Sequence, residues 1–415
     1  AKPIHVESKS SVEIENMNYL RVIRNNWKKC TFGAAVSVYA LQALKTHIEI
    51  EQHMREFASN IQANWISDRP KKVLVVMNPV ANKKRSEKFF KNYCEPVLHL
   101  AGYSVEILRT NHIGHAKTYV EELATLPDAI VVAGGDGTSS EVVTGLMRRR
   151  GNLCPITILP LGRSVQSASK RINIFGVKDV DYVKSLSKAL EPMLKDESQY
   201  QSVIRFDVIN EEDGSNSQLK PIFGLNGLSW GLLEDIDAAK DKYWYFGPLR
   251  HYASAASKSF ADNWSLKTDY VYTPPCPGCV DCAATVQRQE TAQPSGLFTR
   301  GLIKYKNNPG ETKRPLVKND NCSKKFEGSA EASQININCV QNKDNFAELE
   351  SQFISSLQPG WEFIKQIPEV TCSKILPSLV VKSRTIQLHP DGEMGEKFYS
   401  IDGEEYDARP IKSCV

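Results

Sequence analysis

The sequence predicts an α/β N-terminal domain, a parallel sheet with helices on both faces, and then a mostly antiparallel β-sandwich C-terminal domain. Three observations predict this arrangement. Strand and helix patterns alternate over residues 67–200. Short runs of alternating polarity follow over residues 201–415, with few helical patterns between them. A glycine-rich turn at residues 134–138 joins an apolar strand pattern to a helical one.

Composition limits the possible classes of function. The chain has 415 residues, 41% of them hydrophobic and 24% charged, which is typical of a globular protein with two domains. Its formal net charge is only +4, and it contains no lysine-rich block. These features give no support to nucleic-acid binding.

The first segment, residues 1–66, precedes the α/β domain. It contains an uncharged apolar run at residues 30–44, flanked by basic residues. The run is shorter than the roughly twenty residues that span a bilayer, so it predicts either a membrane anchor or an ordinary buried helix. Residues 48–66 predict a polar linking helix. The sequence begins with Ala1, and we interpret neither terminus.

The α/β domain is predicted from alternating apolar patterns. Expected strands are residues 73–79, 104–110, 128–133 and 155–160, and expected helices are residues 84–101, 114–126, 138–150 and 179–194. Gly102 marks the end of the first helix. Because ligands bind at the carboxyl ends of parallel strands, we expect the turns at residues 78–79, 134–138 and 160–162 to share one edge.

The second domain is predicted from shorter runs. Expected strands are residues 203–209, 221–228, 266–272, 334–340, 362–367, 379–382 and 385–389, with helices near residues 248–262 and 344–357. Residues 274–330 are rich in Pro, Gly and Cys, and we expect a long insert there.

The turn Gly134-Gly135-Asp136-Gly137-Thr138 is the main candidate site. Glycines let a ligand approach the backbone, and the N-terminus of the following helix attracts phosphate. A carboxylate in such a place repels phosphate unless it handles a metal or a proton, so Asp136 is expected in one of those roles. The alternative is a glycine turn with no ligand. The motif is neither a P-loop nor a complete dinucleotide fingerprint.

Three cysteines form a local cluster, Cys276, Cys279 and Cys282. Two overlapping CxxC steps are compatible with a metal site, a disulfide, or a loop with exposed thiols. A closed zinc site needs four ligands, and the sequence offers no obvious fourth one nearby.

Five blocks in a fixed order resemble the diacylglycerol kinase family, which includes sphingosine, ceramide and acylglycerol kinases. The resemblance covers roughly residues 70–410. The blocks are Asn78-Pro79, residues 134–146, Pro160-Leu161-Gly162, residues 242–247 and Asp402-Gly403-Glu404. The N-terminal Asn-Trp-Lys-Lys before the apolar run and residues 400–410 resemble the mitochondrial acylglycerol kinase branch.

The resemblance implies ATP-dependent phosphorylation of a lipid hydroxyl, with Mg²⁺ as cofactor. Monoacylglycerol would give lysophosphatidic acid and diacylglycerol would give phosphatidic acid. Asp136 would be the catalytic base, and Asp402 and Glu404 the metal ligands. Nucleotide contacts are expected from Asn78, Gly134, Gly135, Gly137, Thr138, Glu141, Gly162 and Ser164. A hairpin turn is the alternative explanation of Asp402-Gly403.

Two details of the resemblance concern nucleotide and substrate. Most of the family continues Pro-Leu-Gly with Thr-x-Asn-Asp, whereas here Arg163 and Ser164 follow Gly162, which leaves the adenine and ribose contacts undefined. Asp235 matches the acid that faces the lipid headgroup in sphingosine kinases, and its alternative is an exposed acid at a helix start. Four aromatic residues are expected in the sandwich core or in an acyl pocket: Trp230, Tyr243, Trp244 and Phe246.

Other functions stay open at this stage. The chain could be a sphingosine- or ceramide-type kinase, or a kinase of a soluble substrate such as NAD. It could also be a scaffold subunit of the carrier translocase of the mitochondrial inner membrane. The resemblance implies a location at that membrane, facing the intermembrane space, with an acylglycerol lipid as substrate.

Overall fold

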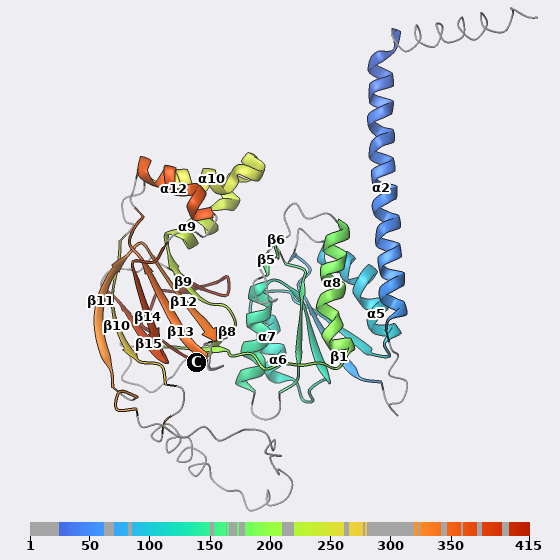
Figure 1. Cartoon of the computed structure of the whole chain (residues 1–415). Coiled ribbons are helices and arrows are strands. Elements are labelled where there is room, and N and C mark those ends of the chain that lie inside the picture. The colour runs from blue at the N-terminus through green and yellow to red at the C-terminus, as the bar shows by residue number, and fades with distance from the viewer. Residues whose placement is uncertain are drawn as a thin grey trace, which may run out of the picture.

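The computed structural model describes residues 25–61, 70–81, 85–149, 153–162, 164–165, 172–173, 179–209, 220–260, 265–276, 279, 319–322, 324–341, 347–357, 360–371, 376–391 and 398–415. The described part contains an α/β unit beside a β-sandwich (Figure 1). A long helix, α2, stands on the side of the α/β unit that is farther from the sandwich and extends beyond it.

The α/β unit is built on a four-stranded sheet in the order β2-β1-β3-β4, and every pairing in it is parallel. Its strands are β1 (Lys72–Met77), β2 (Ser104–Arg109), β3 (Ala129–Gly134) and β4 (Ile156–Pro160). Its helices are α4 (Ser86–Phe89), a π-helical turn (Phe90–Cys94), α5 (Glu95–Leu100), α6 (His115–Glu122), α7 (Asp136–Arg148) and α8 (Asp179–Leu194). The strands and helices expected from the sequence are therefore confirmed here.

Helices cover both faces of this sheet, and the side-chain alternation of β1 explains why. Val73, Val75 and Met77 face α5 and α8 on one side. Leu74 and Val76 face α6 and α7 on the other. A strand buried on both faces reads as a continuous apolar run, as β1 and β3 do. The predicted α/β fold class is correct.

The second unit is a sandwich of two six-stranded sheets, and every pairing in them is antiparallel. One sheet has the order β11-β10-β15-β18-β7-β8 and the other β14-β13-β12-β9-β16-β17. The strands are β7 (Ile204–Val208), β8 (Ile222–Gly224), β9 (Gly227–Gly231), β10 (Leu266–Thr273), β11 (Phe326–Ala332), β12 (Gln334–Gln341), β13 (Ala347–Ile354), β14 (Leu379–Ser383), β15 (Thr385–Pro390), β16 (Phe398–Ile401), β17 (Glu404–Asp407) and β18 (Ile411–Cys414). Side chains from both sheets, among them Phe206, Trp230 and Phe353, form one core.

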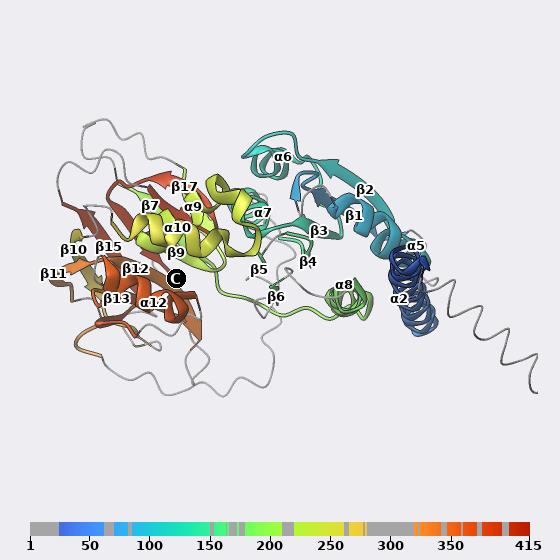
Figure 2. The same cartoon turned by 90° about the horizontal axis from the view of Figure 1, so that it is seen from above.

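Helices cap one end of the sandwich (Figures 1 and 2). They are α9 (Leu232–Ala239), the 3₁₀ segment η2 (Lys240–Leu249), α10 (Arg250–Lys258) and α12 (Trp361–Thr371). Ile236, Ala255 and Phe363 form their shared apolar core. A short two-stranded ribbon, β5 (Ser164–Val165) with β6 (Ile172–Asn173), completes the described elements.

Two secondary-structure predictions in this unit were wrong. Residues 344–357 were expected to be helical, but residues 347–354 form strand β13, which pairs with β12 and β14. Residues 362–367 were expected to be a strand, but they lie in helix α12. In β13, Leu349, Ser351 and Phe353 point into the buried layer, so pairing on both edges outweighs the helix propensity of its Ala, Glu and Leu residues. The apolar spacing in residues 361–367 instead serves the helical cap, where Phe363 and Ile367 are buried.

Two smaller predictions also need correction. Residues 221–228 were expected to form one strand, but a turn divides them between β8 and β9. Strand β11 lies partly inside the expected insert 274–330. Most of the remaining insert lies outside the described residues.

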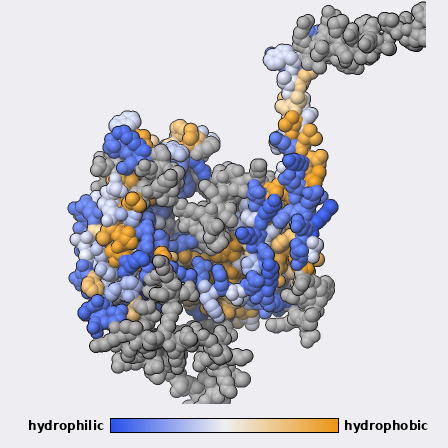
Figure 3. All heavy atoms as spheres, in the orientation of Figure 1, coloured by the Kyte–Doolittle hydropathy of each residue, from blue (hydrophilic) through white to orange (hydrophobic). Residues whose placement is uncertain are grey.

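Helix α2 (Trp27–Ser59) unites the apolar run 30–44 and the linking helix expected after it. None of its residues is buried, so the prediction of an ordinary buried helix was wrong. Large apolar side chains such as Phe32, Tyr39 and Leu41 are more than half exposed, and apolar residues are visible on its protruding part (Figure 3). Within the described residues, we find no helix with both the length and the apolar character needed to cross a bilayer.

The opposite end of α2 is attached to the α/β unit. Met54 and Phe57 pack against its hydrophobic core. His53 Nε2 lies 3.2 Å from the Ser187 hydroxyl of α8. The helix is therefore fixed at one end and exposed along the rest.

Candidate active site where the two units meet

The glycine-rich turn follows the central strand directly. Strand β3 ends at Gly134, Gly135 is extended, and α7 begins at Asp136. The first N–H groups of a helix have no intrahelical acceptor and carry the positive end of its dipole. The half-buried carboxylate of Asp136 thus lies beside a place suited to phosphate.

Three turns meet at this edge of the sheet, as expected from the strand order. The Asn78 amide N–H donates to the Ala133 carbonyl at 3.1 Å, and its side-chain nitrogen lies 3.4 Å from Thr138 Oγ1. Gly162 packs so tightly that a Cβ on it would lie 2.4 Å from Gly135 Cα. Only glycine therefore fits at position 162 without displacing the glycine-rich turn at residues 134–138.

Acids from the C-terminal end of the chain meet this turn. Asp402 and Gly403 form the two-residue turn between β16 and β17, both with positive φ, at 52° and 85°. The hairpin that was the alternative explanation of Asp402-Gly403 is thus present. Burial raises the pKa of Asp402, the backbone hydrogen bonds that it accepts lower it, and the negative charge of Asp136 raises it again.

The carboxylate of Asp402 is held by the backbone of the β8–β9 turn. It accepts hydrogen bonds from the N–H groups of Leu225 at 2.7 Å, Asn226 at 2.9 Å and Gly227 at 3.1 Å. These bonds fix the hairpin against the sandwich and occupy most of the acceptor sites of a carboxylate. Metal ligation by Asp402 stays a prediction.

Glu404 is the second acid of the hairpin and is half-buried. Its Cγ lies against Gly137, and its Oε2 accepts a 2.8 Å hydrogen bond from the Tyr406 hydroxyl. Burial raises the pKa of Glu404 to about 7, and the carboxylate of Glu141 adds to that effect. At neutral pH the group is therefore close to its titration midpoint.

The carboxylate of Glu141 binds the protein's own backbone. Its side chain is buried, Oε1 accepts from the Gly114 N–H at 2.8 Å, and Oε2 accepts from the Ala116 N–H at 3.0 Å. These N–H groups belong to the start of α6, so Glu141 fastens α6 to α7. Its predicted contact with nucleotide stays a prediction.

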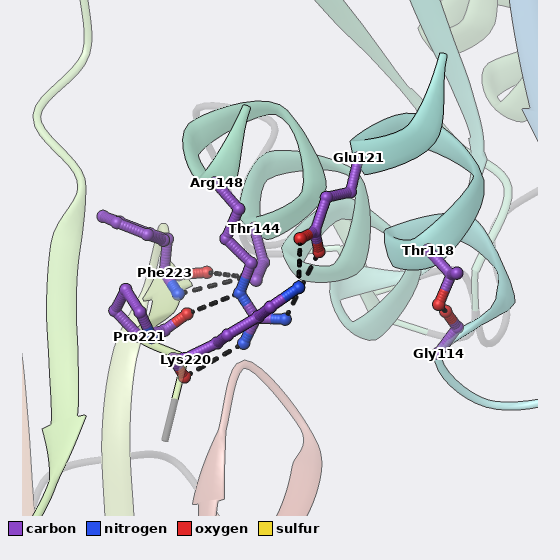
Figure 4. Close-up of polar contacts among 8 residues, drawn as sticks. All are labelled: Gly114, Thr118, Glu121, Thr144, Arg148, Lys220, Pro221 and Phe223. Carbon is purple, nitrogen blue, oxygen red and sulfur yellow. Dashed lines mark hydrogen bonds and ion pairs between the residues drawn. The ribbon is translucent and has the colours of Figure 1, made fainter. Parts of the chain in front are cut away.

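Helix α7 also joins the two units, a role that the sequence reasoning missed (Figure 4). Thr144 Oγ1 donates to the Phe223 carbonyl and accepts from the Phe223 N–H, both at 3.0 Å. Arg148 Nε donates to the Pro221 carbonyl at 2.8 Å, and its guanidinium also pairs with Glu121. Ser140 Oγ donates to the same Phe223 carbonyl at 3.2 Å.

These contacts explain how the site is assembled. Strand β8 is at an edge of its sheet, and α7 side chains satisfy its free backbone edge. Residues 140, 144 and 148 recur every four positions and so lie on one helix face. This recurrence of polar residues at four-residue spacing was the available signal. The face of α7 that binds the sandwich through residues 140, 144 and 148 begins at Asp136.

The predicted lipid-headgroup residue lies in the helical cap. Asp235 is exposed in the first turn of α9. Its neighbour Glu234, which the sequence reasoning did not single out, is half-buried, and burial raises its pKa to about 7 despite hydrogen bonds with Ser229 and Ser400. The repeated acid at the helix start was the signal for it.

The expected aromatic residues divide into two groups. Trp230 is buried in the sandwich core, as predicted. Trp244 and Phe246 are 74% and 47% exposed, so placing them in a core was wrong. The η2 segment departs from helical geometry at Tyr243 and at Gly247, where φ is 56°. Ser164 lies in β5, but its side chain and all of Arg163 lie outside the described residues.

Asp136, Glu141, Asp402 and Glu404 lie near the N-terminal half of α7 and come from two distant parts of the chain. Within the described residues they do not form a group of three ligand atoms close enough to hold one ion, so a metal there would also need oxygens from phosphate or water. Mg²⁺ prefers one or two carboxylates together with phosphate oxygens and water. Glu404, whose proton is easily lost near neutral pH, offers the more accessible oxygens of the two hairpin acids.

Comparison with known proteins gives the site a family context. Residues 72–199 match the diacylglycerol kinase catalytic domain. That match contains the glycine-rich turn and all of α7, whereas the hairpin acids of the sandwich lie beyond it.

Curated relatives extend the comparison. The chain is 32% identical over 242 residues to "Acylglycerol kinase, mitochondrial" of Homo sapiens, which covers 56% of this chain and 54% of that protein. The protein of that name from Mus musculus is 31% identical over the same length. Sphingosine kinase 1 of Homo sapiens is 29% identical over 188 residues, 44% of this chain and 47% of that protein. The chain thus spans about half the length of these curated relatives.

A solved structure, a putative diacylglycerol kinase from Bacillus anthracis str. Sterne, is also similar. It is 18% identical with a TM-score of 0.47, and the match covers 83% of this chain and 94% of that chain. At that level it adds nothing to the strand order and pairing described above.

Proposed function

We propose that this chain is an ATP-dependent lipid kinase that phosphorylates the free hydroxyl of acylglycerols. Monoacylglycerol would yield lysophosphatidic acid, and diacylglycerol would yield phosphatidic acid. The match to the diacylglycerol kinase catalytic domain and the acylglycerol kinase relatives support the reaction class. One structural observation carries the proposal: the hairpin acid Glu404 lies against Gly137, next to Asp136 in the first turn of α7.

The proposed roles follow from the needs of phosphoryl transfer, in which catalysis is mostly positioning and charge neutralisation. Backbone N–H groups of residues 134–138 hold the phosphates, with Asn78 and Gly162 supporting the turn. Asp136 accepts the proton of the attacking lipid hydroxyl, a role that typically contributes about 10² to 10⁴ in rate.

The hairpin supplies the proposed metal site. Glu404 would hold Mg²⁺ together with phosphate oxygens, and Asp402, tied to three backbone N–H groups, would keep the hairpin in register beside it. When bound, the ion neutralises negative charge on the phosphates. Glu141 would position α6, and Tyr406 would position Glu404. Neither residue needs to touch the nucleotide in these roles.

Access to a lipid is supported by the helical cap. Trp244, Tyr245 and Leu249 are 74%, 62% and 60% exposed. The basic residue Lys242 is exposed in the same segment. Exposed aromatic and basic side chains together suit a membrane surface. Asp235 and Glu234 lie at the base of this cap and are proposed to bind the glycerol headgroup.

Location and further partners are proposed from the relatives' names. A mitochondrial membrane, in particular the inner membrane facing the intermembrane space, is the proposed location. The exposed apolar side chains of α2 would contact membrane or protein there. Participation in the carrier translocase stays a prediction from the sequence resemblance.

The deciding experiment is phosphate transfer by the purified chain. Radiolabelled ATP is offered with monoacylglycerol, diacylglycerol, sphingosine, ceramide or NAD, with and without Mg²⁺. Mg²⁺-dependent labelling of the two acylglycerols is the expected result. Labelling of sphingosine or ceramide alone, or of NAD alone, would replace the proposal with the corresponding kinase. An absence of transfer to all of them would leave a scaffold role as the better explanation.

A further inference from the structure

Three cysteine sulfurs converge outside the proposed active site. Cys276, Cys279 and Cys322 are placed with their Sγ atoms within 4.8 Å of one another. Two of them come from the CxxC step after β10, and the third comes from just before β11. Their spacing in sequence gave no hint of this, because most of the insert separates Cys279 from Cys322. Cys282, the last member of the sequence cluster, lies outside the described residues.

Cys276 and Cys322 follow the same end of one strand pair. Strands β10 and β11 pair antiparallel, and their last pair is Tyr272 with Phe326. Cys276 lies four residues beyond Tyr272, and Cys322 lies four residues before Phe326. Both cysteines therefore lie a short and equal number of residues beyond the same end of the ladder, which keeps their two segments close together. Strands β10 and β11 lie at the outer edge of the sandwich (Figure 1).

The local backbone is also organised around these sulfurs. A turn at residues 319–322 brings Cys322 into place, with its N–H donating to the Asn319 carbonyl at 3.1 Å. A second bond runs from the Asn321 N–H to Asn319 Oδ1 at 3.1 Å. Two-residue spacing, as between Cys276 and Cys279, lets both sulfurs reach one ion. Both segments thus hold their cysteines toward a common centre.

The apolar clusters of the described residues do not account for the burial at this place. Cys279 and Cys322 are 1% and 7% exposed, yet neither belongs to the four apolar clusters of the described residues. A tetrahedral zinc–thiolate site with Zn–S bonds of about 2.3 Å places its sulfurs roughly 3.8 Å apart. That spacing lies inside the observed limit of 4.8 Å. Sulfur donors select soft or borderline metals and disfavour Mg²⁺ or Ca²⁺.

We propose that Cys276, Cys279 and Cys322 bind a structural Zn²⁺ ion that ties together the two ends of the insert between β10 and β11. The thiols lose their protons on binding, and the described residues leave one tetrahedral position to another ligand. The ion closes the insert into a loop anchored on the edge of the sandwich, which lowers the entropy of the open insert. This role is independent of the proposed kinase function.

Metal content of the full chain tests the proposal. The wild-type protein is purified without chelators and analysed by mass spectrometry of its metals, and about one zinc ion per chain is expected. Cys276→Ser, Cys279→Ser and Cys322→Ser should each weaken zinc binding by more than about 100-fold. Cys30→Ser on exposed α2 and Cys339→Ser in β12 are matched controls that should keep the zinc.

Measurements on the wild-type chain keep the test decisive even if a variant misfolds. Replacing zinc with cobalt should produce a thiolate charge-transfer band, and chelation should open the insert to limited proteolysis. Three results would overturn the proposal: no metal together with two thiols recovered only after reduction, which indicates a disulfide; iron with a visible chromophore, which indicates a cluster; or zinc retained by all three serine variants.

Discussion

The side chain of Glu404 lies against the backbone of Gly137, so that a Cβ placed on Gly137 would be 3.4 Å from Glu404 Cγ. These residues are far apart in the chain and belong to different units of the fold. Their contact brings an acid of the sandwich to the first turn of α7, one residue from Asp136. The following predictions depend on this junction and on the turn beside it.

Replacing Asp136 with Asn should abolish most phosphate transfer without unfolding the protein. The amide cannot accept the proton of the lipid hydroxyl, so kcat should fall by about 10² to 10⁴. Initial rates with monoacylglycerol measure this, and circular dichroism checks the fold. Asp181→Asn, on the exposed face of α8, is the control and should keep full activity. Equal rates for both variants would remove Asp136 from the mechanism.

Stability should depend on pH through Glu404. Its pKa is about 7 in the folded chain, above the ordinary value of 4.5, so the folded state holds the proton more tightly than the unfolded state. The resulting stabilisation is fully present below about pH 4.5 and is lost as pH rises through 7. Glu404→Gln, which cannot ionise, should therefore show a smaller loss of stability between pH 5 and pH 8 in the absence of Mg²⁺.

Urea unfolding at the two pH values measures this effect. The control is Glu405→Gln, an exposed acid in the same hairpin, which should keep the wild-type pH dependence. The same proton competes with a metal ion, so the apparent affinity for Mg²⁺ in the kinase assay should increase as pH rises through 7. Identical pH profiles for Glu404→Gln and the wild type would contradict the assignment.

Replacing Gly162 with Ala should displace the backbone of the glycine-rich turn at residues 134–138. The added methyl group would lie 2.4 Å from Gly135 Cα, and backbone cannot move aside cheaply. We expect a loss of about 1–3 kcal/mol in unfolding free energy and a higher KM for ATP. Gly33→Ala in α2, where nothing lies within 4 Å of the new methyl group, is the control and should not be destabilised. A normal KM for ATP would show that the turn tolerates the shift.

Replacing Thr144 with Val should loosen the joint between the two units. Valine has the same shape but leaves the Phe223 N–H without its partner and removes one of the bonds to its carbonyl. The cost should be about 1–3 kcal/mol, visible by calorimetry. Thr118→Val, which loses only an exposed bond within α6, is the control and should stay within about 0.5 kcal/mol of the wild type. Activity should fall with Thr144→Val because Asp136 and Glu404 are held on opposite sides of this joint.

Local sequence patterns were enough to predict much of the fold. The parallel sheet was predictable from short apolar runs such as residues 73–77. Helices cover both faces of such a sheet, so its strands are apolar at every position. The glycine-rich turn was recognised because few residue types tolerate a ligand at a helix start. The hairpin was the alternative explanation of Asp402-Gly403 from the sequence, and the positive φ values of both residues agree with it.

Only the tertiary structure decided the rest. Residues 347–354 are a strand, since pairing with β12 and β14 outweighs their helix propensity. The approach of Glu404 to Gly137, the bonds from Thr144 to β8, and the meeting of Cys276 with Cys322 all join residues distant in sequence. Periodicity and turn chemistry report on neighbours along the chain, whereas such contacts depend on how sheets and helices pack. The amino-acid sequence by itself therefore determined most helices and strands and the candidate acid Asp136. Tertiary packing determined which residues surround that acid.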